Sequence, residues 1–224
     1  MTTSVVIGAD RGIAAGLVEI YRGRGDDAIA VCLGDGEAWS GTGVRAIDGI
    51  DVTDDSAVAK LATELAGTRI DTLVHVAGVG ALDRFGRFDT ARMLEHYDLN
   101  ALGPLRVVTA LAENLGQGSK VGIVTSRMAS IGDNSSGRMY SYRMSKAAAN
   151  MLGVNLYHEL RPKGVCVMLL HPGTVATQMT RGAKNWEEMT KPSEAAAGLA
   201  AQLDALGPDT PPEFRHADGT LLPW

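Results

Sequence analysis

Near its beginning the chain reads Val5-Val6-Ile7-Gly8-Ala9-Asp10-Arg11-Gly12-Ile13-Ala14, an apolar run that leads through a glycine turn into a helical pattern. Gly8 permits a tight turn, and Gly12 lets the backbone approach a pyrophosphate, which the N-terminus of the following helix would stabilise. Ala14 stands where a third glycine is common and is still small enough for close helix–strand contact. An ordinary turn is the alternative interpretation, but the position after the first strand favours dinucleotide binding.

Short apolar runs alternate with helical patterns along the rest of the chain, which is typical of a parallel sheet with crossover helices. Strands are expected at 5–7, 28–33, 44–47, 72–76, 121–124, 165–170 and 214–222, the last with a turn at Asp218-Gly219. Helices are expected at 12–22, 55–65, 90–99, 101–115, 142–160 and 192–206. The sequence shows no internal repeat, low-complexity tract or linker, so residues 1–224 are interpreted as one α/β domain.

The composition indicates a soluble globular protein rather than a disordered one, since 45% of the 224 residues are hydrophobic and 21% are charged. Acidic residues outnumber basic ones by 26 to 21 and no Lys/Arg run stands out, so neither nucleic acid nor a membrane is an expected partner. The N-terminus has no basic leader, and no apolar run approaches the ~18 residues of a membrane span. A cytoplasmic location is expected.

A second chemical signal is the stretch Ser141-Tyr142-Arg143-Met144-Ser145-Lys146. On a helix, Tyr142 and Lys146 leave the same face one turn apart. The pKa of a phenol in water is about 10, and a fixed ammonium beside it favours the phenolate. Such a pair is a candidate general acid or base for carbonyl and alcohol chemistry. Taken alone the pattern is weak, because an exposed Tyr/Lys helix face is the usual explanation.

Further segments of chemical interest follow the expected strands. The fourth strand ends at His75-Val76-Ala77-Gly78, the fifth at Thr125-Ser126, and the sixth at His171-Pro172-Gly173-Thr174-Val175-Ala176-Thr177. In an open parallel sheet, ligands bind beyond these carboxyl ends. Asp51-Val52, just past the third strand, lies where an adenine would sit. An equally supported alternative is that Asp51 belongs to the N-cap region of the following helix. Asn100 lies between two helical patterns instead.

The seven motifs described above, taken in their order along the chain, resemble the short-chain dehydrogenase/reductase family over the whole chain. Ser126-Arg127-Met128 and the ending Asp218-Gly219-Thr220 with Pro223-Trp224 are similar to its C-factor and sniffer-like carbonyl reductase branch. The resemblance implies a single-domain Rossmann fold, a doubly wound, mostly parallel seven-stranded sheet in the order 3-2-1-4-5-6-7 with helices on both faces. It also implies an NAD(P)-dependent oxidoreductase that interconverts an aldehyde or ketone and an alcohol, and a homodimer or homotetramer.

The resemblance assigns roles position by position. Tyr142 would give its proton to the carbonyl oxygen, and Lys146 would bind the nicotinamide ribose and lower the pKa of Tyr142. Ser126 would hydrogen-bond the substrate oxygen, and Asn100 would hold a water that links Lys146 to solvent. No metal is expected. The cofactor-binding residues implied are Gly8, Asp10, Arg11, Gly12, Ile13, Asp51, Val52, Ala77, Gly78, Tyr142, Lys146, Pro172, Gly173, Val175 and Thr177, the last two beside the carboxamide.

The sequence leaves two site assignments open. Ser126 lies further before Tyr142 than the family spacing usually places the serine, and Ser130 fits that spacing better, although Ser126 is preferred because it ends a strand. Arg11 could reach the 2′-phosphate of NADP, whereas Asp35 could bind the ribose hydroxyls of NAD. NADP is slightly favoured on Arg11.

Two broader alternatives also stay open. Residues 178–191 are either a lid over the substrate, with Met179, Trp186 and Met189 as its apolar side chains, or a mobile surface loop. The protein itself is either the enzyme described above or a non-catalytic NAD(P)-binding regulatory protein on the same fold. The intact Tyr142 and Lys146 favour the enzyme.

Cys32 and Cys166 are expected to be buried and unpaired. The implied strand order separates them by four strands, roughly 19 Å at ~4.8 Å per strand. A disulfide needs Cα atoms within about 7 Å. Free thiols fit a reducing cytoplasm.

Overall fold

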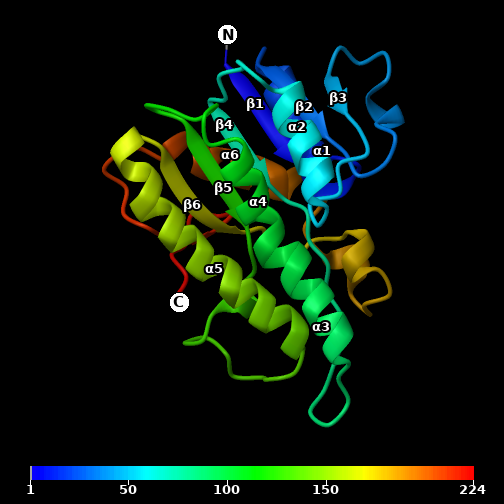
Figure 1. Cartoon of the computed structure of the whole chain (residues 1–224). Helices are drawn as coiled ribbons and strands as arrows, with labels where there is room; N and C mark the ends of the chain where they lie inside the picture. Colours follow the sequence, from blue (N-terminus) through cyan, green and yellow to red (C-terminus); the bar gives the residue numbers. More distant parts are fainter. Residues whose placement is uncertain (1) are drawn as a thin grey trace.

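The structure, a computed structural model, describes residues 2–224 and is built on one seven-stranded sheet (Figure 1). The strand order is β3-β2-β1-β4-β5-β6-β7, and every neighbouring pair is parallel, which confirms the expected fold. The strands are β1 (Thr3–Ile7), β2 (Asp27–Val31), β3 (Arg45–Ile47), β4 (Thr72–His75), β5 (Lys120–Val124), β6 (Cys166–His171) and β7 (Phe214–His216).

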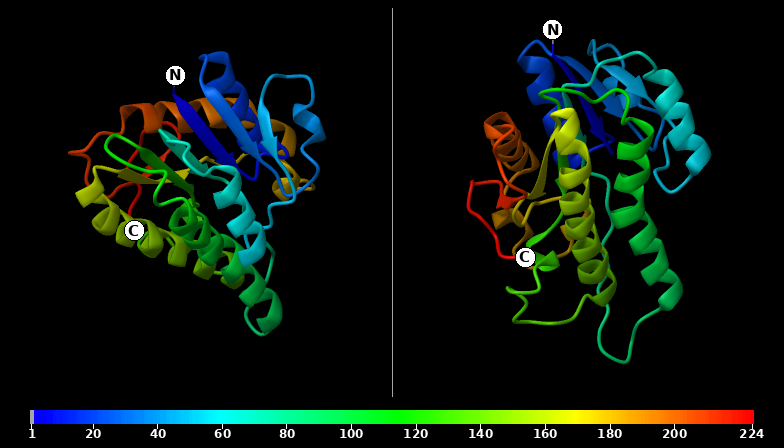
Figure 2. Two further views of the ribbon diagram at one scale, coloured as in Figure 1. Left: turned by 45° about the horizontal axis from the view of Figure 1, so that its top comes forward. Right: turned by 60° about the vertical axis from the view of Figure 1, so that its left-hand side comes forward.

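Six α-helices cover the two faces of the sheet: α1 (Gly12–Gly23), α2 (Asp55–Glu64), α3 (Thr90–Tyr97), α4 (Gly103–Ala110), α5 (Tyr140–Leu160) and α6 (Pro192–Ala205). Helices α1 and α6 pack together on one face, while α2, α4 and α5 contribute to the core on the other (Figure 2). None of the helices in residues 2–224 is long and apolar enough to cross a membrane.

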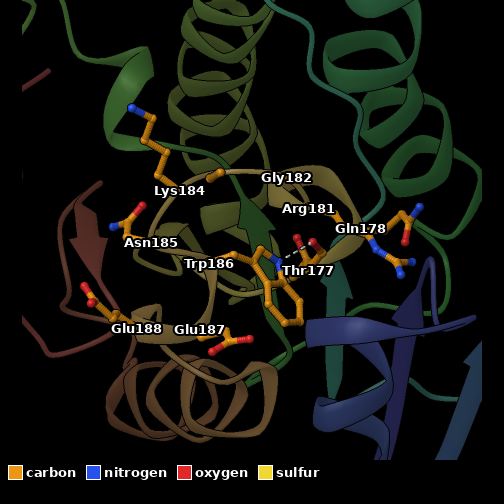
Figure 3. Close-up of a pocket in the computed structure, with 10 residues that line it drawn as sticks. Thr177, Gln178, Arg181, Gly182, Lys184, Asn185, Trp186, Glu187 and Glu188 are labelled. Atoms are coloured by element: carbon orange, nitrogen blue, oxygen red, sulfur yellow. Dashed lines mark hydrogen bonds between the residues drawn. The ribbon is translucent and has the colours of Figure 1, made fainter.

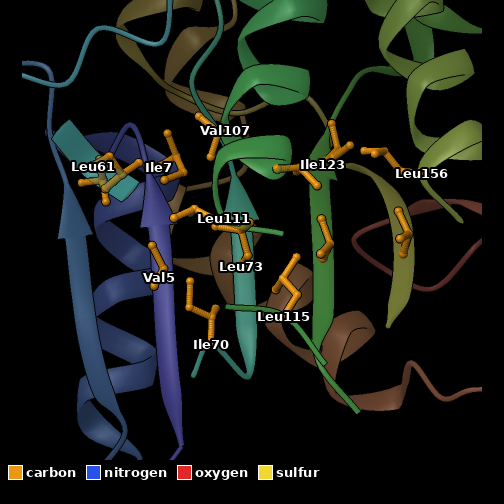
Figure 4. Packing of buried hydrophobic residues seen from close by; sticks show 14 of the residues in the cluster. Val5, Ile7, Leu61, Ile70, Leu73, Val107, Leu111, Leu115, Ile123 and Leu156 are labelled. Carbon is orange, nitrogen blue, oxygen red and sulfur yellow. The ribbon is translucent and has the colours of Figure 1, made fainter. Parts of the chain in front are cut away.

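Two apolar clusters, one on each face, form the core. Successive side chains of a strand point to opposite faces, so Val5 and Ile7 enter one cluster while Val6 enters the other. Figure 4 shows the first cluster, in which Leu73 and Leu111 are completely buried between the sheet and α4. Burial on both faces explains why the strands read as continuous apolar runs without polar alternation.

Several element boundaries differ from the expected ones. Strand β2 ends at Val31, two residues early, because the backbone N–H groups of Leu33 and Gly34 donate to the Asp10 carboxylate and leave the ladder. Strand β6 begins and ends one residue late, and His171 pairs with His216 of β7.

The expected helices 90–99 and 101–115 are wrong in their boundaries. Helix α3 ends at Tyr97, a π-helical turn follows over Asp98–Leu102, and α4 ends at Ala110. Beyond α4, the Asn114 amide donates to the carbonyl oxygens of Leu65 and Thr68 at 2.7 Å each, so the chain there is tied to the end of α2 instead of continuing the helix.

Two further expectations, the turn near the end of the chain and the unpaired cysteines, are confirmed. The chain turns at Asp218-Gly219, after which Leu221 forms an antiparallel bridge with Arg215. Cys32 and Cys166 are both buried and unpaired.

Candidate active site

Tyr142 and Lys146 lie one turn apart in the first half of α5, as the spacing predicts. Lys146 is only 4% exposed, and its Nζ donates to the carbonyl oxygen of Val124 at 3.0 Å. The ring of Tyr142 lies against Gly80, where an added Cβ would stand 3.4 Å from the ring carbon Cδ2. Helix α5 thus brings both side chains to the carboxyl end of β5.

The electrostatics of this pair differ from expectation. Burial lowers the pKa of Lys146 to about 8. Burial also raises the pKa of Tyr142 above its ordinary value, and a hydrogen bond with Ser126 opposes that rise. The expected lowering of the phenol pKa is therefore not seen in this structure, because burial raises that pKa by more than the neighbouring groups lower it. A phenol with a raised pKa stays protonated at neutral pH and suits a proton donor.

The two candidate serines have different surroundings. Ser126 follows β5, hydrogen-bonds with Tyr142 and accepts from the N–H of Met128 at 3.2 Å. The Ser130 hydroxyl donates to the carbonyl oxygen of Trp224 at 3.2 Å and accepts from the N–H of Asp133 at 3.0 Å. The structure therefore brings Ser126, and not Ser130, to the phenol.

Asn100 lies in the π-helical turn between α3 and α4, and its amide makes three hydrogen bonds that leave one acceptor site on Oδ1. Its Oδ1 accepts from the N–H of Val79, and its Nδ2 donates to the carbonyl oxygen of Val79 and to the hydroxyl of Ser145, all at 2.9 Å. A Cβ on Gly78 would stand 3.1 Å from both Asn100 Oδ1 and Lys146 Nζ. Asn100 and Lys146 therefore meet over Gly78, where only glycine fits without displacing them. Turns of the π type are frequent at functional sites.

His75 lies below this group at the end of β4. It is buried, and burial together with the nearby Lys146 lowers its pKa to about 3. Its Nε2 has no hydrogen-bond partner within the part of the chain that the structure describes. A neutral, enclosed imidazole fits a structural role for His75.

The glycine turn has the shape that a pyrophosphate needs. Gly8 and Gly12 have φ angles of +85° and +65°, and a Cβ on Gly8 would come within 2.9 Å of the backbone of Ala77. Within residues 2–224 no side chain caps the N-terminus of α1, and its first turn holds no acidic residue. A Cβ on Gly12 would meet, among the described residues, only a methyl carbon of Thr177 within 4 Å. Unsatisfied N–H groups therefore point into open space beside Thr177.

The residues expected at the adenosine end of the site differ in whether their charged groups already have partners in the protein. The Asp10 carboxylate accepts from the N–H groups of Leu33 and Gly34 at 3.0 and 2.7 Å. Arg11 is exposed and has no ion-pair partner among residues 2–224. Asp51 accepts from both the N–H and the hydroxyl of Thr53, so its carboxylate already serves a local turn.

Four other residues predicted to bind the cofactor have the following surroundings. Val52 is buried and packs against Gly103, where an added Cβ would stand 2.8 Å from it. Ile13 is half-buried in the first turn of α1. Pro172 and Gly173 follow β6, and Gly173 lies against His216.

The segment after β6 is folded. The N–H of Thr190 donates to the carbonyl oxygen of Thr174, and Val175 bridges Thr190, which joins the two ends of the segment. The indole Nε1 of Trp186 donates to the carbonyl oxygen of Thr177 at 3.2 Å, across a cavity of about 630 Å³ (Figure 3). Arg181, Lys184, Glu187 and Glu188 also line this cavity, so its lining carries charges of both signs.

One residue of the site has no sequence signal. Asp83 is 3% exposed, and its carboxylate accepts from the N–H groups of Tyr140 and Ser141 and from the Ser141 hydroxyl. It satisfies the N-terminus of α5 just before Tyr142. Arg138 and Met139, which precede the helix, have left-handed φ angles of 59° and 50°.

Known proteins are similar to this chain in sequence. The family model for short chain dehydrogenase matches residues 2–188. The chain is 47% identical over 226 aligned positions, covering all of both proteins, to the 1-hydroxy-2-glutathionyl-2-methyl-3-butene dehydrogenase of Rhodococcus sp. (strain AD45). It is 40% identical over 167 positions to the C-signal of Myxococcus xanthus, covering 73% of this chain and 98% of that protein.

A solved structure is also similar to this chain over its whole length. The carbonyl reductase from Pseudomonas aeruginosa PAO1 in complex with NADP superposes with a TM-score of 0.85 and 29% identity, covering all of both chains.

Proposed function

Because the chain belongs to the short-chain dehydrogenase/reductase family and is an NAD(P)-dependent oxidoreductase of it, we propose that Tyr142 exchanges the proton when carbonyl and alcohol interconvert. The observation that carries this proposal is the meeting of Tyr142, Ser126 and the buried Lys146 at the carboxyl end of β5. The glycine turn opens onto the same edge of the sheet.

The residues present fit NAD(P). The turn at Gly8 and Gly12 and the uncapped N-terminus of α1 would hold the pyrophosphate, and Val175 and Thr177 would adjoin the nicotinamide. When bound, the cofactor donates or accepts a hydride at the substrate carbon.

The chain supplies the proton and the charge stabilisation. In reduction, negative charge develops on the substrate oxygen, and the hydroxyls of Ser126 and Tyr142 are two donors aimed at one position. Tyr142 then releases its proton to that oxygen. The ammonium of Lys146 stabilises the phenolate that remains, while Asn100 holds the water through which the proton is replaced. The π-helical turn and the contact of both residues with Gly78 support this last role.

Three substitutions test these roles. The reaction is followed by the absorbance of the reduced nicotinamide with a panel of aldehydes and ketones. Tyr142→Phe is expected to lower kcat by about 10²–10⁴-fold, and Ser126→Ala by about 10²-fold. Ser130→Ala keeps kcat near the wild-type value. Equal activity of wild type and Tyr142→Phe would remove the phenol from the mechanism.

We infer that NADP is preferred over NAD. Arg11 is exposed and unpaired in the described chain at the start of α1, where it can pair with a 2′-phosphate. The fixed carboxylate of Asp10 at the end of β2 opposes this preference, so a modest one is expected. Arg11→Gln should lower kcat/KM for NADPH by about tenfold and leave that for NADH unchanged. An unchanged NADPH/NADH ratio would show that Arg11 does not select the cofactor.

The substrate class is inferred from the 47% identical relative, whose name describes the dehydrogenation of a glutathionyl alcohol. Alcohols joined to glutathione through a thioether are therefore the first compounds to assay in the oxidative direction, beside small aldehydes and ketones in the reductive one. Turnover of the small carbonyl compounds alone would place the protein with general carbonyl reductases.

The similarity to the C-signal favours a second candidate, a regulatory protein that binds NAD(P) without turnover. Calorimetry separates the two. Binding of NADPH or NADH without reduction of any aldehyde or ketone, and without alcohol oxidation by the oxidised cofactors, supports the regulatory protein. Turnover that Tyr142→Phe abolishes supports the enzyme.

We also propose that residues 1–224 act as one domain in a cytoplasmic homodimer or homotetramer. Two buried free thiols fit a reducing compartment. Met144 and Met151 of α5 are 58% and 63% exposed and give the helix an apolar outer face that a second copy could cover. Light scattering of the purified protein reports the oligomer, and cell fractionation reports the compartment.

A further inference from the structure

A second cavity, of about 420 Å³, lies on the substrate side of the site. Three segments that are distant in sequence form it: the loop after β4, the turn after β5 and the segment before α5. The side chains important here are Leu82, Arg84, Met128, Arg138 and Met139.

The residues that line the cavity are neighbours in sequence of the reacting groups. Met139 lies one helical turn before Tyr142, and Met128 follows Ser126 by two residues. Leu82 comes two residues after Gly80, which contacts the ring of Tyr142. Residues of the cavity lining therefore stand within two or three positions of Gly80, Ser126 and Tyr142 along the chain.

Two unpaired guanidinium groups line the cavity from opposite loops. Arg84 and Arg138 are exposed and make no ion pair or side-chain hydrogen bond with any of residues 2–224. The one acidic side chain in the lining, Asp83, is buried and saturated by three donors from Tyr140 and Ser141. Hydrogen bonds from Ser141 and Tyr140 hold its pKa below the ordinary value despite burial, which pushes that pKa up.

Of the other cations nearby, Arg92 lies close to Asp83 outside the lining, and two more are engaged. Arg127 pairs with Asp133, and Arg143 donates to the carbonyl oxygens of Gly137 and Met128 and to the Ser136 hydroxyl. The free cations of the lining itself are therefore Arg84 and Arg138, and Arg92 adds positive charge beside Asp83. This positive charge stands out in a chain of net charge −5.

We propose that this cavity is an oxyanion subsite, in which Arg84 and Arg138 select substrates that carry a carboxylate or phosphate several bonds from the reacting carbon. Guanidinium groups pair with planar oxyanions through two parallel hydrogen bonds. The apolar side chains of Leu82, Met128 and Met139 suit the uncharged middle of such a substrate. This inference rests on the proposed function, since it places the reacting carbon at Tyr142.

The test compares charged aldehydes with an uncharged analogue. The probes are para-formylbenzoate, the longer para-formylcinnamate, their methyl esters, and para-formylphenyl phosphate. In the wild type, kcat/KM for at least one oxyanion should exceed that for its uncharged reference by about tenfold. The reference for each carboxylate is its methyl ester, and the reference for the phosphate is methyl para-formylbenzoate. The two carboxylates and the phosphate distinguish which oxyanion the subsite accepts.

The variants Arg84→Gln and Arg138→Gln should each reduce this preference by about tenfold, through KM, while turnover of the esters is unchanged. Arg22→Gln, on the exposed surface of α1, is the matched control and should leave the preference intact. Thermal melting shows that each variant is folded. Equal kcat/KM for every oxyanion and its uncharged partner in the wild type, or a preference unchanged in both variants, would overturn the proposal.

A binding measurement separates this proposal from the function itself. Calorimetric binding of para-formylbenzoate should weaken in Arg84→Gln and Arg138→Gln whether or not any aldehyde is reduced. Binding that depends on the arginines without turnover would reject the proposed function and keep the subsite. Reduction of the esters without such binding would keep the proposed function and reject the subsite.

Discussion

Lys146 shows how a functional side chain costs stability. The group is buried, and burial lowers its pKa from 10.5 to about 8. The unfolded chain therefore binds the proton more tightly than the folded one between these two values. Folding is disfavoured by about 3 kcal/mol below pH 8, and the penalty disappears as the pH rises towards 10.5.

Lys146→Met removes this penalty together with the hydrogen bond to the Val124 carbonyl. We expect the variant to gain stability relative to the wild type below pH 8 and to lose that relative gain by about 3 kcal/mol as the pH approaches 10.5. Urea denaturation at pH 7 and pH 10 measures the difference. A stability difference that does not vary with pH would mean that Lys146 is not desolvated.

Among the acidic residues, Asp83 is a buried side chain that is expected to affect both stability and activity. It accepts from two N–H groups at the start of α5, and Asn can accept in their place from one only. Asp83→Asn should cost about 1–3 kcal/mol of stability and lower kcat, because Tyr142 lies in the first turn of the same helix. Chemical denaturation and steady-state kinetics measure the two effects. Wild-type kcat in a variant of reduced stability would limit Asp83 to a structural role.

At this scale the sequence predicts what depends on local spacing. Tyr142 and Lys146 share a helix face because they are four residues apart. Asp83 contacts Tyr140 from 57 residues away, through a loop whose path depends on the whole fold, so no local pattern marks it. The direction of the Tyr142 pKa shift was missed for the same reason, since it depends on the burial of the phenol.

At the scale of elements, the type of each segment was predictable and its ends were not. Apolar periodicity gives the helices on either side of Asn100, but the π-helical turn over Asp98–Leu102 depends on tertiary contacts. There, Gly103 packs directly on Val52, and the Asn100 amide binds the backbone of Val79. The second strand ends early because a side chain from the glycine turn, Asp10, takes its N–H groups.

The packing of α5 on β6 leads to a prediction for this scale. A Cβ on Gly153 would come within 2.5–2.9 Å of the side-chain carbons of Leu169. Gly153→Ala should therefore lower stability by about 1–3 kcal/mol through overpacking, although alanine favours the helix. Gly23→Ala is the matched control, because none of the described residues comes within 4 Å of that position in α1. It should be neutral or stabilising by up to about 1 kcal/mol.

Urea denaturation midpoints of the two glycine variants decide the point. Similar midpoints for Gly153→Ala and Gly23→Ala would show that α5 can move away from the sheet without cost. Since α5 carries Tyr142, such freedom would also weaken the argument that this helix holds the phenol in a fixed position.

At the scale of the whole molecule, the order of the strands follows from the alternation of apolar runs and helices together with the resemblance to a known family. That order brings Ser126 and the glycine turn to one edge of the sheet. The oxyanion subsite was not predictable in the same way. Arg84 and Arg138 are 54 positions apart in a chain of net negative charge, and only the fold places them around one cavity.

The last residue of the sequence takes part in the same long-range organisation. The carbonyl oxygen of Trp224 accepts from the N–H of Gly132 at 2.8 Å and from the Ser130 hydroxyl at 3.2 Å. Its indole stacks on the ring of Phe214 with centroids 6.0 Å apart. Trp224 therefore fixes the start of the segment that leads through Arg138 to the catalytic helix.

Trp224→Ala removes the stacking contact and should loosen residues 131–139. Because Arg138 lines the substrate-side cavity while the glycine turn lies elsewhere, we expect KM for an oxyanion-bearing aldehyde to rise by about tenfold and KM for the cofactor to stay unchanged. Steady-state kinetics with each substrate varied in turn measures both values. A matched rise in both KM values would indicate a general loss of structure. An unchanged aldehyde KM would show that the segment is held without the indole.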